Sequence, residues 1–494
     1  MATVRHLIGY FWPRANARWG RVGSLGTLAR KDEFRGFLPV ASRVTARIID
    51  LDLTPEQALA GWPANRPLAA LWSGDPVASR WCVLAAPTGV APPSLAAERL
   101  ARPLIPTAPN DYPPFVGGMI GWVSYDHGRA LEPKAQSRAP LRARSDRPWP
   151  EAIWVECPDG LVFDRANSRW WSFGRGLTIP RETTPSSGFR VLRPASRTGR
   201  RAYITGVRRV LEYIRSGDVY QINLAHRLSA RFEGSARALW RALLEPAAPR
   251  FGVYVEADVG ARRFVLAGAS PELFLDYDPA SGRLTTRPMK GTRPAHPGSR
   301  EDLSDSAKDR AELAMIVDLM RNDLGRVCDL GSVRVEEERA IEEHGDERSS
   351  RRLLQATALV SGQVRPGASV NDVLRATFPG GSVTGAPKIR AMQIIDELEP
   401  VRRGPYCGAA GFVSDTGHFA FNITIRSALL SGAPTPGGPD ALRGTLDYSI
   451  GAGIVAESDP ASEWRETLDK ARVLRAALAN ANRGTGARSP ARMS

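Results

Sequence analysis

The chain has 494 residues, of which 43% are hydrophobic and 24% are charged, and these proportions exclude a disordered or collagen-like protein. Its net charge of +15 would fit a nucleic-acid partner, but only six of the 67 basic residues are lysine and aromatic residues are not interleaved with the arginines. No apolar run reaches the roughly eighteen residues that a spanning helix needs. The four cysteines are far apart and form no CxxC pair, which favours reduced thiols. We therefore expect a cytoplasmic protein that binds neither nucleic acid nor a membrane.

The chain divides by composition into two globular ranges. Residues 1–175 contain short apolar runs separated by turn residues, which predicts β-strands with few helices. Residues 176–200 are rich in proline, serine, threonine and arginine, and this composition predicts a linker or surface loop. Residues 201–482 form the second range, and residues 483–494 are expected to be a disordered tail.

Within the second range, apolar residues change between helical spacing and strand-like runs. Helices are predicted over residues 201–218, 307–327, 370–378, 386–400 and 462–482, and strands over residues 221–232, 263–277, 418–430 and 445–456. This mixture predicts the α/β class, more closely α+β, with helices packed outside antiparallel sheets.

Two pairs of carboxylates stand on predicted helices. Asp309 and Glu312 are three residues apart on one helix, and Glu463 and Glu466 are three apart on another, so each pair shares a helical face. Two such faces brought together would offer oxygen ligands to Mg²⁺. Solvated acidic faces are the alternative, and the spacing alone favours that alternative.

Two glycine-rich stretches could bind an anion through backbone N–H groups. In residues 378–392, glycines and Ser382 precede Pro387 and Lys388 at the start of a predicted helix. Residues 451–454 are expected to be a second such loop before the helix that carries Glu463. A tight connection without a ligand is the alternative for each stretch.

Lys290 is one of the rare lysines and lies in the stretch TRPMKGTRP, shortly after the run SPE that contains Glu272. A lysine that burial keeps neutral could act as a nucleophile beside this carboxylate. A structural ion pair explains the same residues equally well, and the sequence does not decide between the two.

Ten motifs in one order resemble those of the chorismate-utilising enzymes, and most closely the aminodeoxychorismate synthase branch of that family. They are PPFVGGMIGWVSYD, GDVYQINL, ASPELF, RPMKGTRP, AELAMIVDLMRNDLGRV, FPGGSVTGAPK, YCGAAG, FNITIR, GAGIVAESDP and SEWRETLDK. The resemblance implies a core of two antiparallel sheets surrounded by helices. It makes residues 201–482 the chorismate-binding catalytic domain, with residues 1–175 packed against it.

The resemblance also implies roles for individual residues. Glu312 and Glu466 would bind Mg²⁺, and Asp309 and Glu463 would hold its waters. Glu272 would act as the general acid that protonates the departing C4 hydroxyl of chorismate. The residues implied to bind chorismate are Asn223, Gln221, Thr292, Ser382, Tyr406, Arg426, Gly451, Gly453 and Lys470.

Two positions distinguish the branches of the family. Enzymes that add water carry a lysine where this chain has Gln221, and anthranilate synthases carry an alanine where it has Lys290. Lys290, together with Asn223, therefore implies the synthase that converts chorismate and ammonia to 4-amino-4-deoxychorismate, the precursor of para-aminobenzoate and folate, through a covalent lysine adduct. We expect a separate glutaminase subunit to supply the ammonia in a heterodimer. Anthranilate synthase component 1 is the alternative.

The chain departs from the family pattern in two places. Gln355 stands where relatives have a substrate-facing histidine, and the stretch from Leu71 to Gly74 differs from the one that lines the tryptophan pocket of feedback-inhibited relatives. We therefore expect an altered rate and no control by tryptophan. An arginine-rich nucleic-acid-binding protein on an inactive scaffold is a distant alternative, because Glu312, Glu466 and Lys290 are all present.

Overall fold

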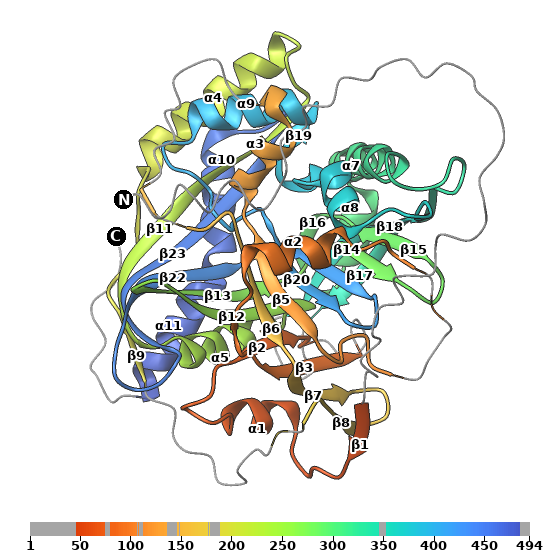
Figure 1. The fold of residues 1–494 in the computed structure, drawn as a ribbon. Coiled ribbons are helices and arrows are strands. Elements are labelled where there is room, and N and C mark those ends of the chain that lie inside the picture. Colours follow the sequence, from red (N-terminus) through yellow and green to blue (C-terminus); the bar gives the residue numbers. More distant parts are fainter. Residues whose placement is uncertain are drawn as a thin grey trace, which may run out of the picture.

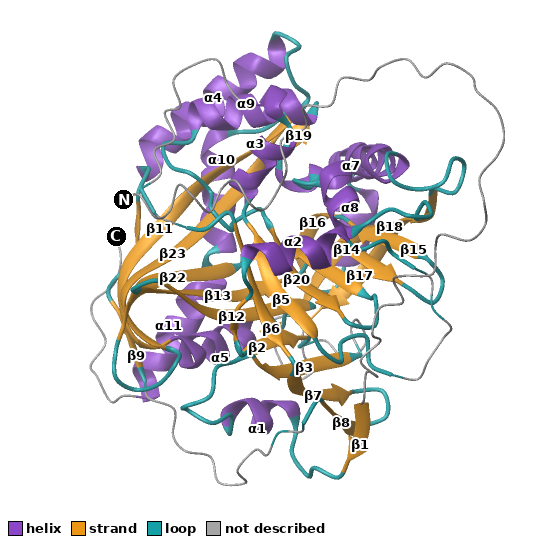
Figure 2. Ribbon diagram, viewed as in Figure 1, coloured by secondary structure: helices purple, strands orange, loops and turns teal. Residues whose placement is uncertain are grey.

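The structure is a computed structural model, which describes residues 46–484 apart from 75–79, 106, 108–111, 136–145, 148, 176, 178–187 and 345–351. Two large sheets form its centre, and helices lie outside them (Figures 1 and 2). The strand pairs in both sheets are antiparallel. This confirms the predicted class and the predicted two-sheet core. No helix in the described ranges is long and apolar enough to cross a membrane.

The first sheet has 13 strands within the described residues, and it combines strands from both ends of the chain. In spatial order these are β1 (Ala46–Ile49), β8 (Arg169–Phe173), β7 (Asp159–Asp164), β3 (Trp81–Ala86), β2 (Ala69–Trp72), β12 (Phe251–Val259), β13 (Arg262–Ser270), β22 (Ser427–Pro434), β23 (Ala441–Ile454), β11 (Gln221–Ser235) and β10 (Ala195–Ser196). Two short strands, β9 (Phe189–Val191) and β19 (Gly385–Ala386), also pair with β11.

The second sheet has ten strands in the part of the chain that the structure describes. In spatial order they are β16 (Met289–Pro294), β18 (Leu353–Gln363), β15 (Arg283–Arg287), β14 (Leu273–Asp278), β21 (Phe419–Ile423), β20 (Ala409–Ser414), β5 (Gly118–Val123), β6 (Ala152–Cys157) and β4 (Gly89–Val90). β17 (Arg334–His344) pairs with β18 beside this path.

The helices cover the outer faces and ends of the sheets (Figure 2). They are α1 (Pro55–Ala60), α2 (Pro93–Ala101), α3 (Gly128–Leu131), α4 (Gly199–Arg215), α5 (Ala236–Ala247), α6 (Ser299–Asp305), α7 (Ala307–Gly325), α8 (Val370–Thr377), α9 (Lys388–Leu398), α10 (Pro460–Lys470) and α11 (Arg472–Gly484). α7 packs on β18, α10 packs on β23 and α4, and α11 packs on α5.

The strands of the first globular range take part in both sheets. β2 pairs with β12, and β5 pairs with β20, so residues 1–175 and 201–482 share their sheets. One apolar cluster joins them, with Trp122 and Trp154 from the first range and Phe421 from the second all almost fully buried. Burial of such large aromatic side chains is a major source of stability.

Two expectations about elements need correction. The stretch 176–200 contains β9 and β10, which pair with β11, and α4 begins at its end. The helix expected over residues 462–482 is interrupted at Ala471, because α10 packs on β23 while the following helix α11 packs on α5. The expected tail lies outside the described residues beyond Gly484.

Two further stretches expected to be continuous strands each pass from one sheet to the other. The stretch 263–277 forms β13 in the first sheet and β14 in the second, and the chain crosses at Pro271 and Glu272. The stretch 418–430 likewise forms β21 and β22, and the chain crosses between Ile423 and Ser427. Sequence periodicity gives no sign of such a crossing, because the apolar pattern continues through it.

The pairing of β20 with β21 tolerates only glycine at residue 411. A Cβ atom at residue 411 would lie 1.9 Å from the carbonyl oxygen of Ala420 on β21. We expect Gly411→Ala to lower the free energy of unfolding by about 3 kcal/mol, because the backbone itself must move. Gly325→Ala, where nothing lies within 4 Å of the added atom, is the matched control. Equal thermal unfolding temperatures of the two variants would contradict this close packing.

Candidate active site

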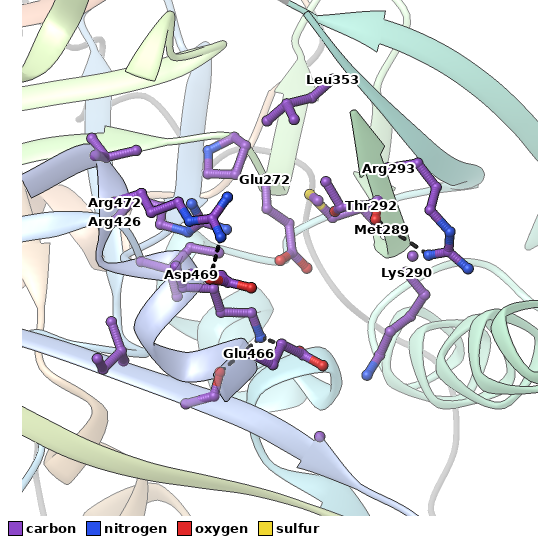
Figure 3. Close-up of a pocket in the computed structure, with 18 of the residues that line it drawn as sticks. Glu272, Met289, Lys290, Thr292, Arg293, Leu353, Arg426, Glu466, Asp469 and Arg472 are labelled. Atoms are coloured by element: carbon purple, nitrogen blue, oxygen red, sulfur yellow. Dashed lines mark hydrogen bonds and ion pairs between the residues drawn. The ribbon is translucent and has the colours of Figure 1, made fainter. Parts of the chain in front are cut away.

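A cavity of about 1020 Å³ lies beside the two places where strands cross between the sheets (Figure 3). Every predicted site residue except Gln221 lines it: Asn223, Glu272, Lys290, Thr292, Asp309, Glu312, Ser382, Tyr406, Arg426, Gly451, Gly453, Glu463, Glu466 and Lys470. These residues come from both sheets and from α7 and α10, so only the tertiary fold brings them together.

The strand crossings hold Glu272 and Arg426 in place. Glu272 follows β13, and its carbonyl oxygen accepts a hydrogen bond of 3.1 Å from the N–H of Ile423. The carbonyl oxygen of Arg426 accepts one of 3.3 Å from the N–H of Ala269. Arg426 has a φ of +52°, an unusual backbone conformation for a residue with a side chain. Figure 3 shows the Glu272 side chain projecting into the cavity between Arg426 and Lys290.

Glu272 is placed to carry a proton at neutral pH. Glu272 is only 5% exposed, and burial raises the pKa of its carboxyl group to about 7. The hydroxyl of Ser382 and the ammonium groups of Lys290 and Lys470 favour the ionised form and limit the shift. A pKa near the working pH is suited to a general acid.

Lys290 lies on β16, and its side chain extends into the cavity as far as Gly453 on β23. Its ammonium group forms an ion pair of 3.1 Å with Glu312 on α7. The register of β16 against β18 shifts between Lys290 and Thr292, and the intervening Gly291 has a φ of +81°. A Cβ atom on Gly453 would lie 2.8 Å from the Lys290 Nζ atom, so the ammonium rests directly on this glycine.

Gln221 lies next to Lys290 although it does not line the cavity. It begins β11 and is completely buried, and neither polar atom of its amide has a hydrogen-bond partner among the described residues. The amide nitrogen is 3.5 Å from the position of a Cβ atom on Gly453. The Gln221 amide and the Lys290 ammonium group therefore both lie beside the position that a Cβ atom on Gly453 would take.

The four predicted metal-binding carboxylates lie near the starts of two capped helices. The Ser306 hydroxyl accepts a hydrogen bond from the N–H of Asp309 at the start of α7, and Asp459 caps α10 in the same way. Glu466 forms an ion pair of 2.8 Å with Lys470. Burial opposes ionisation of Glu466, but Lys470 outweighs it and leaves the pKa of Glu466 below its usual value.

Glu463 is the most deeply buried of these carboxylates. One of its oxygens accepts a hydrogen bond of 2.6 Å from the Ser458 hydroxyl, and the other is buried with no partner in the described structure. Burial raises the pKa of Glu463; the Ser458 hydroxyl opposes this rise, and the nearby Glu466 adds to it. Asp309 instead forms an ion pair of 3.0 Å with Arg293.

These residues fit a divalent cation by the chemistry of their donors. Within the described ranges no three His, Cys, Asp or Glu side chains converge into a ready-made metal cluster. The carboxylate oxygens of Glu312 and Glu466 are ligands that Mg²⁺ prefers, and the unpartnered oxygen of Glu463 lies on the same helix as Glu466. A cation there would replace the lysine partners that Glu312 and Glu466 have in this structure.

Tyr406, Gly451 and Lys470 lie in contact with one another in the cavity wall. Tyr406 is 5% exposed, and burial raises the pKa of its phenol well above the usual value. A Cβ atom on Gly451 would lie 3.0 Å from the Tyr406 hydroxyl. The carbonyl oxygen of Gly451 accepts a hydrogen bond of 2.7 Å from Lys470.

The anion-nest predictions need correction. Residues 451–454 are not a loop, because the ladder between β23 and β11 continues through them and pairs Gly453 with Asn223. In the other stretch, α9 begins at Lys388, but the ammonium group of Lys388 forms an ion pair of 2.6 Å with Asp323 and does not line the cavity. From this stretch only Ser382 and Val383 reach the cavity.

Several lining residues were not singled out from the sequence. Among them are four basic residues that add positive charge to the cavity wall: Arg293, Lys308, Arg352 and Arg472. Gln355, which replaces the expected histidine, is buried outside the lining, and its amide donates a hydrogen bond of 3.5 Å to the Thr292 hydroxyl. The rarity of lysine could have drawn attention to Lys308, but the arginines have no distinguishing signal among so many.

The sequence pattern of the family described as chorismate binding enzyme matches residues 89–476 of the chain. The chain belongs to the chorismate-binding enzymes. The matched range covers both strand crossings, α7 and α10, and therefore the whole cavity wall described above. The likeness in motif order is thus confirmed at the level of the family.

Individual chorismate-binding relatives carry two different names. Aminodeoxychorismate synthase component 1 of Klebsiella aerogenes is 36% identical over 393 residues, which cover 77% of this chain and 81% of that protein. Anthranilate synthase component 1 of Streptomyces coelicolor is 35% identical over 434 residues, which cover 80% of this chain and 79% of that protein. These identities are too similar to distinguish the two reactions.

Solved structures of chorismate-binding enzymes share the fold. Anthranilate synthase component I of Streptococcus pneumoniae superposes with a TM-score of 0.62 at 24% identity, over 90% of this chain and 94% of that one. The menaquinone-specific isochorismate synthase of Escherichia coli gives a TM-score of 0.64 at 17% identity, over 88% of this chain and 94% of that one. At these identities the likeness concerns the fold alone.

The raised pKa of Glu272 predicts a stability cost at alkaline pH. A carboxyl group that prefers its proton in the folded state stabilises the protein least above pH 7, and the cost disappears as the pH falls toward about 4.5. We expect Glu272→Gln to raise the free energy of unfolding by about 3 kcal/mol at pH 8 and by less at pH 5.5. Glu256→Gln, which removes the buried ionic partner of Arg237, should lower it instead. An equal gain for Glu272→Gln at both pH values would contradict the shift.

The contact between Gly453 and Lys290 predicts a selective loss of activity. Gly453→Ala should displace the flexible ammonium group of Lys290 while leaving the thermal unfolding temperature nearly unchanged. A displacement of about 1 Å in a reacting group can reduce turnover by roughly a hundredfold. Addition of Lys290→Ala to this variant should then cause no further loss, because both changes act on one group. Independent losses in chorismate turnover would show that residue 453 acts in another way.

Proposed function

We propose that this chorismate-binding enzyme converts chorismate and ammonia to 4-amino-4-deoxychorismate through a covalent adduct on Lys290. The observation that carries the proposal is the position of Lys290, whose ammonium group lies in the cavity over Gly453 and beside Gln221. The resemblance to the family gives anthranilate synthases an alanine at this position, where no adduct could form. The product would serve as the precursor of para-aminobenzoate and folate.

In the first step, the Lys290 ammonium group loses a proton to solvent, and its nitrogen then forms a bond to C2 of the chorismate ring. The ring double bond shifts, the bond between C4 and its hydroxyl oxygen breaks, and the protonated Glu272 donates the proton that makes water the leaving group. The pKa of Glu272, raised by burial to about 7, supports this role because the carboxyl group keeps a large protonated fraction near neutral pH.

In the second step, ammonia forms a bond to C4, the double bond shifts back, and the bond from C2 to the lysine nitrogen breaks. The adduct nitrogen carries the surplus proton of the first step as an ammonium, so Lys290 departs as a neutral amine. The product nitrogen retains its own third proton as an ammonium group, and Glu272 recovers a proton from solvent. The sum is chorismate plus ammonium giving aminodeoxychorismate and water.

The remaining lining residues would bind the substrate. Arg426 and Tyr406 would hold the enolpyruvyl carboxylate, for which a guanidinium group is well suited. Mg²⁺, held by Glu312 and Glu466, would neutralise the ring carboxylate beside Lys470. Further contacts would come from Asn223, Thr292, Ser382 and the backbone of Gly451 and Gly453, with Asp309 and Glu463 near the cation; Gln221 would lie behind Lys290, outside the lining.

Ammonia would come from a separate glutaminase subunit or from free ammonium. The similar relatives are named as component 1 of their synthases, which supports a second component for this enzyme. We place the reaction in the cytoplasm, in keeping with four free and buried cysteines at residues 82, 157, 328 and 407.

Anthranilate synthesis is the second candidate, because relatives with that name are as similar as those of the proposed branch. The two reactions differ in their products. Anthranilate synthase releases pyruvate and fluorescent anthranilate, whereas aminodeoxychorismate keeps its enolpyruvyl group. The product therefore distinguishes them directly.

The test is incubation of the purified protein with chorismate, Mg²⁺ and ammonium, with the products identified by mass spectrometry. We expect aminodeoxychorismate from the wild type, and a loss of at least a hundredfold together with loss of the protein-bound adduct in Lys290→Ala. Lys308→Ala, which removes another lysine lining the cavity, is the matched control and should still form the adduct. Anthranilate from the wild type, or full activity of Lys290→Ala, would overturn the proposal.

A further inference from the structure

A buried ion pair lies behind the cavity wall and has no role in the chemistry above. Arg403 is 5% exposed and Glu399 is 4% exposed, and neither lines the cavity. The guanidinium group donates two hydrogen bonds to the Glu399 carboxylate, of 3.0 Å from Nε and 2.7 Å from Nη2. It also lies 4.5 Å from the centre of the Tyr125 ring.

The same guanidinium group connects two segments that do line the cavity. Nη2 donates a hydrogen bond of 2.5 Å to the carbonyl oxygen of Asn223, at the start of β11. Nη1 donates one of 2.8 Å to the carbonyl oxygen of Val383, next to Ser382 in the segment before α9. Arg403 therefore joins the backbone of Asn223 to the backbone beside Ser382, in addition to a direct hydrogen bond of 2.8 Å from the N–H of Asn223 to the carbonyl oxygen of Thr384.

Its partner Glu399 completes the connection. One carboxylate oxygen of Glu399 accepts a hydrogen bond of 2.9 Å from the N–H of Ala225, two residues after Asn223 on β11. The side chain of Asn223 also donates a hydrogen bond of 3.4 Å to the carbonyl oxygen of Val383. The ion pair thus contacts β11 at two positions, Asn223 and Ala225, and the Val383 segment at one.

We propose that the Arg403–Glu399 pair is a positioning pair, which fixes Asn223 and Ser382 relative to each other so that both contact chorismate. A simple gain in stability does not explain it, because apolar side chains of similar volume often replace a buried ion pair without loss. A planar guanidinium group that reaches two carbonyl oxygens and a carboxylate at once provides geometry that no apolar side chain can. The inference needs only a chorismate-binding cavity and does not depend on the proposed lysine chemistry.

The chain contains a closely matched control. Arg237 forms the same kind of fork with Glu256, and it also donates hydrogen bonds to the carbonyl oxygens of Pro63 and Arg66. Glu256 accepts a hydrogen bond of 2.8 Å from the N–H of Leu68, as Glu399 does from Ala225. This second pair is equally buried, but none of its residues or backbone partners lines the cavity.

The test compares apolar replacements of the two pairs in the full-length enzyme. Arg403→Met with Glu399→Leu, and Arg237→Met with Glu256→Leu, remove each pair without leaving an unpaired charge. We expect the first double variant to keep a thermal unfolding temperature close to that of the second. Its kcat/KM for chorismate consumption should nevertheless fall at least tenfold, with a weaker chorismate affinity by titration calorimetry and a KM for ammonium within twofold of the wild type.

If a double variant fails to fold, the single variant Arg403→Lys tests the same positioning role. Lysine keeps the charge beside Glu399 but cannot reach both carbonyl oxygens, so the same tenfold loss is expected. Arg237→Lys should keep kcat/KM within twofold of the wild type. A normal chorismate affinity and kcat/KM in the Arg403 variants, or an equal loss in the Arg237 variants, would overturn the inference. Because the assay follows chorismate, a different reaction product would overturn the proposed function and leave this result intact.

Discussion

The active site depends on two stretches of chain, residues 263–277 and 418–430, that each pass from one sheet to the other. Glu272 and Arg426 lie at these crossings, and hydrogen bonds between the crossings hold them together, including one of 2.6 Å from the Ser270 hydroxyl to the carbonyl oxygen of Ile423. Residues of both crossings and of both sheets line the cavity. The backbone, rather than a mobile loop, therefore determines where the reacting groups lie.

Charge balance governs the state of the groups inside the cavity. Glu312 and Glu466 each have a lysine partner, whereas Glu272 is buried with only more distant cations to favour its ionised form. The same wall thus holds carboxylates paired with lysines, whose oxygens suit a cation, and one carboxyl group suited to carrying a proton. In the proposed function, separation of these two states by their surroundings would allow metal binding and acid catalysis in one cavity.

The space over Gly453 is where the branches of the family would differ in chemistry. Lys290 and Gln221 both border it, and a larger residue at position 453 would exclude the lysine. Gln355 borders Thr292 on the next strand, so the replacement of the usual histidine acts at the edge of the same region. In the proposed function, small changes around this one glycine would select which nucleophile reaches the ring.

The sequence by itself determined the family, the two-sheet class and the helix faces that carry Glu312 and Glu466, because motif order and local spacing encode these features directly. It also singled out Lys290 as a candidate nucleophile, but it left an ion pair equally possible. Only the tertiary structure decided that Lys290 rests on Gly453 and that Arg403 joins two cavity segments. The contacts of Lys290 with Gly453 and of Arg403 with Asn223 link residues more than a hundred positions apart, and such contacts leave no local pattern in the chain.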